Sequence, residues 1–176
     1  GSETRHMPDN SFILAWSSIS GGWTYAYLKQ FFQDVIKKIA GIDISDQEVY
    51  TRMNSFLEMD IGDSDLDVNP RFSGTRSNPG IRGEIKSINA ENFTPEKITQ
   101  AFAKSMIQEL YDIIPASCMS DITSIIGCGN AIRKNPRVLK IAAKCFGKPV
   151  TMAQTKEAAA LGAALSAQNS LHTRRG

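Results

Sequence analysis

The 176-residue sequence contains few of the residues that carry most catalytic and metal-binding chemistry. Its only two histidines, His6 and His172, lie close to the ends of the chain, and its three cysteines, Cys118, Cys128 and Cys145, do not have the spacing of a metal site. A histidine-dependent nucleophilic triad and a structural zinc site are therefore not expected. An odd number of scattered cysteines is typical of reduced thiols, and we expect a cytoplasmic protein.

Strong net charge and long apolar runs are also missing. The chain has 20 Lys and Arg against 18 Asp and Glu, a formal net charge of +2, so composition favours neither nucleic-acid nor membrane binding. The apolar run at residues 12–16 is far shorter than a membrane-spanning helix needs. An apolar content of 41% is ordinary for a globular protein of about one domain.

The two ends of the sequence are expected to lie outside the domain. Residues 1–7, GSETRHM, have the composition of an expression-tag remnant, and residues 169–176 are expected to form a tail. The domain should span residues 8–168. Because an apolar segment follows almost immediately after residue 8, we expect the chain to be a piece of a longer protein.

One stretch, residues 121–150, organises the rest of the chain. An apolar run at residues 122–126 predicts a buried strand, and Gly127-Cys128-Gly129 predicts a tight turn after it. Asn135-Pro136 predicts the start of a helix, with Asn at the N-cap and Pro at the first helical position. Gly147 should end that helix. A strand, glycine turn and helix in this order can bring a ligand close to the backbone, although a purely structural turn has the same pattern.

The remaining segments alternate between strands and helices. Ser20-Gly21-Gly22 should open a helix that ends at Gly41. A capping box of Ser45 and Glu48 predicts a second, peripheral helix. We expect Met53 in this helix, and Met59 after it, to fill the core. We predict strands at residues 11–18, 66–72, 83–88 and 150–153, a long helix from Thr94-Pro95 to Pro115, and a helix of small residues over 155–167 that approaches its neighbours closely. This order predicts an α/β fold with a mixed sheet flanked by helices.

An acidic stretch at residues 61–67 superficially resembles a calcium loop. It lacks the closing glutamate that such a loop uses, so we expect a solvated turn and no metal site. The absence of a GxxxxGK[ST] motif likewise excludes a P-loop nucleotide site. Strands almost free of carboxylates also argue against a two-metal nuclease.

Three segments resemble the C-terminal domain of the FGGY family of carbohydrate kinases. These are GCGNAIRKNPRVLKIAAKCFGKPV at residues 127–150, EAAALGAALSA at residues 157–167, and SGTRSNP with a later Arg82-Gly83, which is similar to the family's SGER-x-P…RG segment. Thr75 replaces the usual acidic residue there, as in the sedoheptulokinase-like branch. Arg76 of this segment could face an interdomain cleft or form a structural ion pair.

The resemblance implies a ribonuclease H-like, actin-like ATPase fold in which the strand, turn and helix at residues 121–150 hold adenosine. The nucleotide-binding residues that it implies are Gly22, Ala26, Gly127, Gly129, Asn130, Ala131, Arg133 and Asn135. For Gly22 a helix packed tightly on its sheet is an equal alternative. The implied cofactors are ATP and Mg²⁺, and the implied parent activity is transfer of the ATP γ-phosphate to a ketose hydroxyl, with a sedoheptulose-type sugar as substrate.

The same resemblance places the catalytic aspartate, the phosphate loops and the sugar pocket before residue 8. We therefore expect no catalytic residue and no metal ligand in this chain, and no kinase activity from the chain alone. A non-catalytic nucleotide-binding module of actin-like fold is the alternative function.

Overall fold

The computed structural model describes residues 2–7, 10–62, 65–129, 132–133 and 135–173, with side chains to residue 168. The helices are α1 (Gly21–Ala40), α2 (Asp46–Glu58), α3 (Pro95–Asp112), α4 (Ala116–Met119), α6 (Arg137–Phe146) and α7 (Ala158–Thr173). The strands are β1 (Glu3–His6), β2 (Phe12–Ala15), β3 (Asp67–Asn69), β4 (Glu84–Lys86), β5 (Ile125–Gly127) and β6 (Val150–Met152). Strand β1 lies within the residues that we had assigned to a tag remnant, and α7 runs past the predicted end at residue 167.

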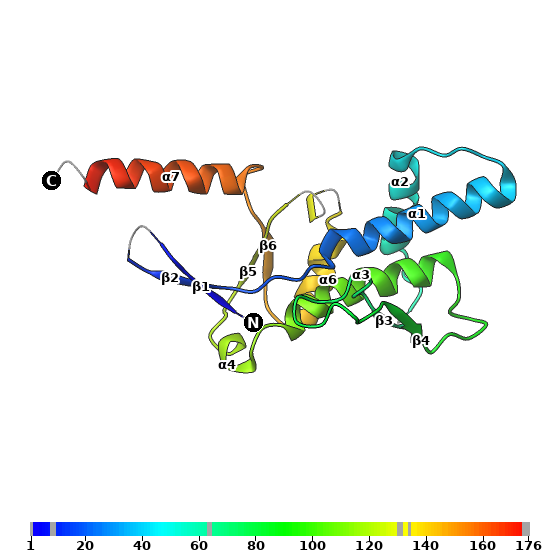
Figure 1. The fold of residues 1–176 in the computed structure, drawn as a ribbon. Helices are drawn as coiled ribbons and strands as arrows, with labels where there is room; N and C mark the ends of the chain where they lie inside the picture. The colour runs from blue at the N-terminus through cyan, green and yellow to red at the C-terminus, as the bar shows by residue number, and fades with distance from the viewer. Residues whose placement is uncertain (1, 8–9, 63–64, 130–131, 134, 174–176) are drawn as a thin grey trace.

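The strands form three separate two-stranded sheets. Pairs β1–β2 and β3–β4 are antiparallel, and β5–β6 is parallel (Figure 1). The prediction of α/β structure is confirmed, but a single mixed sheet is not found among the described residues. The strands are only three or four residues long, and each pairs with one neighbour.

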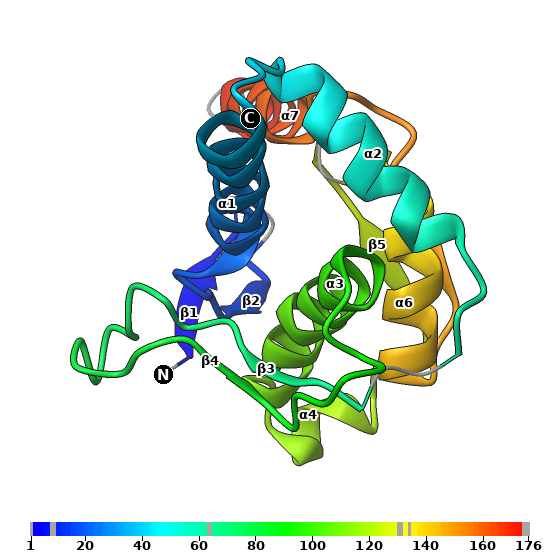
Figure 2. The ribbon, with the colours of Figure 1, turned by 90° about the vertical axis from the view of Figure 1, so that its right-hand side faces the viewer.

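The core lies between helices α1, α2 and α3 and strand β3, which surround it in Figure 2. Met53 of α2 is 1% exposed, and Phe102 of α3 is 3% exposed. The prediction that α2 is peripheral was therefore wrong, because its apolar face closes the core. The prediction for Met53 is confirmed, whereas Met59, just past the end of α2, is 45% exposed.

The predicted helix ends are confirmed at three places. Ser45 Oγ accepts a hydrogen bond from the Glu48 amide at the start of α2, and Thr94 Oγ1 accepts one from the Lys97 amide at the start of α3. Gly41 adopts φ 70° directly after α1, the left-handed conformation that glycine allows at a helix end. Local sequence therefore determines where these helices begin and end.

The hairpin β1–β2 and helix α7 extend away from the helical core (Figure 1). We predicted a buried strand at residues 11–18, but Phe12 is 64% and Leu14 51% exposed. In α7 a Cβ on Gly162 would meet no atom within 4 Å, so the predicted close packing of this helix is also absent. Among the described residues, no element covers the apolar side chains of β2 or of α7. These side chains are therefore exposed, although the sequence predicted a buried strand and a closely packed helix. Within the residues that the structure describes, no helix is long and apolar enough to span a membrane.

Candidate functional site

The predicted turn lies at the carboxyl end of a parallel strand pair. Ile125 pairs with Val150 and Gly127 with Met152, so β5 and β6 both end at the same edge. The chain leaves β5 at Gly127 and enters α6 at Arg137. In sheets with parallel strands, ligands bind outside the carboxyl ends of the strands, so the turn occupies a position that suits a ligand.

The two glycines of the turn serve different purposes. Gly127 is buried, and a Cβ there would lie 3.0 Å from both Ile132 Cδ1 and Leu139 Cδ2, so a larger residue would have to displace these side chains. Gly129 is exposed and adopts φ 98°, which side-chain-bearing residues rarely do. A Cβ on Gly129 would meet no atom of the described residues within 4 Å, so these residues leave the space beside its backbone open. Asn130 and Ala131, which we predicted to bind nucleotide, lie outside the described residues.

Asn135 holds the start of α6 from inside the protein. Its side chain is 5% exposed, accepts a hydrogen bond from the Arg137 amide at 3.1 Å and donates one to Asn54 Oδ1 at 3.0 Å. We predicted Asn135 at the N-cap and Pro136 at the first helical position, but the helix begins at Arg137 with Pro136 as its N-cap. The predicted capping hydrogen bond is nevertheless present, one residue further from the helix.

The same asparagine connects the turn to helix α1. Asn54 Oδ1, on α2, also accepts a hydrogen bond from the Tyr25 hydroxyl at 3.4 Å. Burial raises the pKa of Tyr25 well above its usual value, so its hydroxyl remains a hydrogen-bond donor at neutral pH. Two hydrogen bonds through Asn54 therefore link Asn135, before α6, to Tyr25 of α1.

Arg133 makes its contacts with the protein itself. Its guanidinium donates hydrogen bonds to the carbonyl oxygens of Ala153, at 2.9 Å, and of Thr155. These carbonyls follow β6, so Arg133 ties the turn after β5 to the segment after β6. We predicted that Arg133 contacts the nucleotide, and in the structure its side chain binds the backbone of the segment that follows β6.

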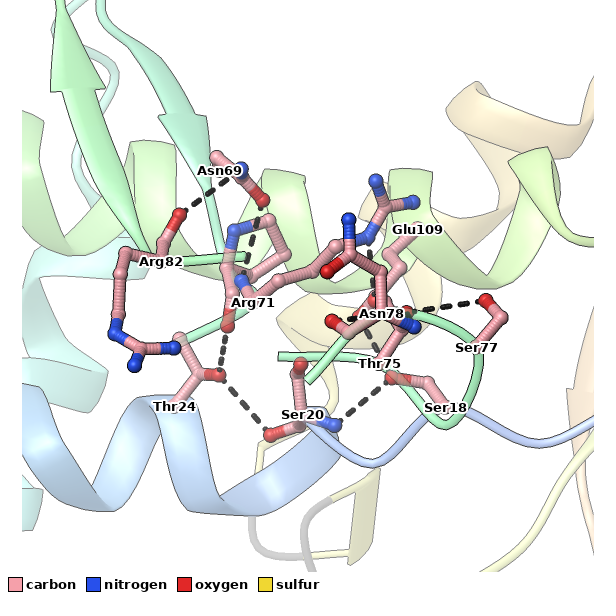
Figure 3. A network of polar contacts seen from close by, with 11 residues as sticks. Ser18, Ser20, Thr24, Asn69, Arg71, Thr75, Ser77, Asn78, Arg82 and Glu109 are labelled. Atoms are coloured by element: carbon pink, nitrogen blue, oxygen red, sulfur yellow. Dashed lines mark hydrogen bonds and ion pairs between the residues drawn. The ribbon is translucent and has the colours of Figure 1, made fainter. Parts of the chain in front are cut away.

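Helix α1 begins beside a polar network that the sequence did not reveal (Figure 3). Glu109 of α3, 6% exposed, accepts hydrogen bonds from Ser18 Oγ at 2.6 Å and from Arg71 Nε at 3.1 Å. Ser18 Oγ accepts one from the Ser20 amide, and Thr24 Oγ1 donates to the Pro70 carbonyl at 2.8 Å. The only sequence signal was a glutamate within the apolar surroundings of the long helix.

The first turn of α1 is open at the positions that we predicted to bind nucleotide. Gly22 is exposed, and a Cβ there would meet no atom within 4 Å, while Ala26 is half-buried. Tight packing of this glycine on a sheet, the alternative that we considered, is therefore not what the structure has. Among the described residues, each of Gly22 and Gly129 has open space beside its own backbone.

The loop at residues 73–82 is ordered by its own contacts. Thr75 Oγ1 accepts a hydrogen bond from the Asn78 amide, and the Thr75 amide donates to the Asn78 carbonyl. Arg76 forms an exposed ion pair with Glu3 at 3.3 Å, which is the structural alternative to a position in a cleft. Such exposed pairs contribute little to stability.

The described residues contain no group of three or more His, Cys, Asp and Glu side chains that could hold a metal ion. Cys118, Cys128 and Cys145 are all free thiols, as predicted.

Comparison with protein-family models identifies the chain. Residues 17–170 match the C-terminal domain of the FGGY family of carbohydrate kinases. The chain belongs to this family. No curated protein matches the sequence.

Solved structures of family members have the same fold. Xylulose kinase from Bifidobacterium adolescentis covers 98% of the chain with a TM-score of 0.69 and 19% sequence identity, and the chain covers 32% of it. Ligand-bound xylulose kinase from Lactobacillus acidophilus covers 96% with a TM-score of 0.69 and 16% identity, with 35% of it covered. Gluconate kinase from Lactobacillus acidophilus covers 84% with a TM-score of 0.62 and 15% identity, with 30% of it covered. The chain therefore spans about a third of the length of these kinases.

Proposed function

We propose that this chain is the ATP-binding part of a longer cytoplasmic carbohydrate kinase, which transfers the γ-phosphate of ATP to a ketose hydroxyl. The observation that carries the proposal is Gly129: an exposed glycine at φ 98°, with open space beside it, in the segment that resembles the family's adenosine-binding turn. A planar base or a ribose can approach the backbone there without meeting a side chain of the described residues.

The described residues fit adenosine better than they fit the phosphates. Open backbone at Gly129 and Gly22, as far as the described residues go, suits a flat ligand, and hydrogen bonds through Asn54 link Asn135 to Tyr25 of α1. ATP supplies the phosphoryl group when bound. We assign the phosphate contacts, the Mg²⁺ ligands, the sugar pocket and the catalytic base to the rest of the parent protein.

For the acceptor we propose a ketose of the sedoheptulose type. Support comes from Thr75, which stands where most family members have an acidic residue, as in the sedoheptulokinase-like branch. The loop around Thr75 is held by its hydrogen bonds with Asn78, so its conformation does not depend on a carboxylate.

The test is a coupled assay of ADP release by the full-length parent with sedoheptulose, xylulose and gluconate. We expect turnover with sedoheptulose at the highest kcat/KM. Turnover that favours xylulose or gluconate would overturn the acceptor and leave the kinase in place. ATP binding without turnover on any sugar would overturn the kinase and favour the non-catalytic module.

A second measurement concerns the chain alone. With little ligand surface buried against it, ATP should bind with a Kd on the order of millimolar. In an NMR titration the amide shifts should concentrate at Gly22, Gly127 and Gly129. Shifts spread elsewhere, with none at these glycines, would contradict the assignment of the site.

A further inference from the structure

A cavity lies beside helix α6, away from the predicted nucleotide turn. It has a volume of about 710 Å³, within the range of small-molecule sites, and lies between α3, α6 and the segment that follows α2. Gly127, Gly129 and Asn135 are not among its lining residues. The cavity is therefore separate from the proposed adenosine site, and the proposed kinase activity does not account for it.

The walls of this cavity are strongly basic. Lys104 of α3 faces Arg137, Lys140 and Lys144 of α6, and Asp60 is the one carboxylate among the described lining residues. Within the described part of the chain, no ion pair is found for Lys104 or Lys140, while Arg137 lies 3.9 Å from Glu58. No described ion pair compensates these two charges, and a bound anion would do so.

The floor of the cavity is apolar and rigid. Leu57 and Ala101 are 2% and 5% exposed and form part of the core. Gln100 donates hydrogen bonds to the carbonyls of Phe56 and Met59, at 2.8 and 2.9 Å, which fixes the start of the overlying segment. An apolar floor beneath cationic walls concentrates the field of the cations on an anion inside the cavity.

The spacing of the cations indicates the class of ligand. Arg137, Lys140 and Lys144 are separated by three and four residues and so lie on one face of α6, over a rise of about 10 Å. We propose that this cavity binds a small molecule that carries two or more phosphate groups, which bridge from α6 to Lys104. A single phosphate would engage only part of this row.

The experiment measures binding of inorganic tripolyphosphate to the 176-residue chain by calorimetry. Inorganic phosphate, which carries a single phosphate group, is the comparison. We expect tripolyphosphate to bind at least about tenfold more tightly than phosphate. The double variant Lys104→Gln/Lys140→Gln should weaken tripolyphosphate binding more than tenfold, because it removes two charge-assisted contacts. Both side chains are exposed, so the variant should melt at the same temperature as the parent chain.

The matched control is Lys38→Gln/Lys37→Gln, which removes the same charge at the far end of α1. If this control weakens tripolyphosphate binding as much as the cavity variant does, the effect is general charge and the proposal is wrong. Absence of measurable tripolyphosphate binding would also overturn it. Neither result bears on ATP turnover by the parent kinase, so this proposal and the proposed function fail independently.

Discussion

Replacement of Glu109 by alanine should strongly destabilise the chain. The carboxylate is 6% exposed and accepts hydrogen bonds from Arg71 and Ser18. Breaking a buried ion pair by removing one partner costs about 3–5 kcal/mol, but Arg71 is one-third exposed and can regain water, so we expect about 3 kcal/mol. Arg71→Ala leaves the buried carboxylate without its ionic partner and should also cost about 3 kcal/mol.

Urea unfolding of the chain measures these costs as a lower midpoint at unchanged slope. The double variant Arg71→Ala/Glu109→Ala should lose about 3 kcal/mol, about 3 kcal/mol less than the sum of the single variants, since both single variants break the same interaction. Glu91→Ala, at an exposed position, is the matched control and should change stability by less than about 0.5 kcal/mol. Strict additivity of the two variants would refute the claim that Glu109 and Arg71 act together to hold the start of α1.

Three further substitutions test the packing around the site. Met53→Ala should cost about 3 kcal/mol in urea unfolding, because this 1%-exposed side chain leaves a cavity between three helices. Gly127→Ala should cost about 1–2 kcal/mol, since its Cβ would lie 3.0 Å from two side chains of the turn and α6; an unchanged midpoint would mean that these side chains move freely. Asn135→Ala removes a helix-capping bond and the contact with Asn54, and thermal melts should show a loss of about 1–2 kcal/mol.

The local features of this fold could be predicted from the sequence. The capping hydrogen bonds of Ser45 and Thr94, the helix end at Gly41 and the order of strand, turn and helix within residues 121–150 depend on neighbouring residues, and the structure confirms them. The prediction of a buried strand at residues 122–126 was wrong in its burial and bounds, because β5 spans Ile125–Gly127 and Ile126 is 65% exposed. The positive φ of Gly129 was anticipated for the same reason.

The features that depend on distant parts of the chain were not predicted. The apolar strand at residues 12–15 was expected to be buried, yet its burial requires a neighbour that the described residues do not provide. Helix α2 was called peripheral, because nothing local shows that Met53 meets Phe102. The positions of Arg133 and Glu109 follow from partners 20 and 38 residues away, which no spacing rule reveals.

The central claim, that adenosine lies against Gly129, is tested most directly by the Michaelis constants of Gly129→Val in the full-length kinase. The matched control is Gly147→Val, because both glycines have positive φ and open space, so both substitutions strain the backbone. We predict that Gly129→Val raises KM for ATP at least about tenfold with little change in KM for the sugar, while Gly147→Val lowers the melting temperature without changing either constant. A folded Gly129→Val enzyme with an unchanged KM for ATP would contradict the account.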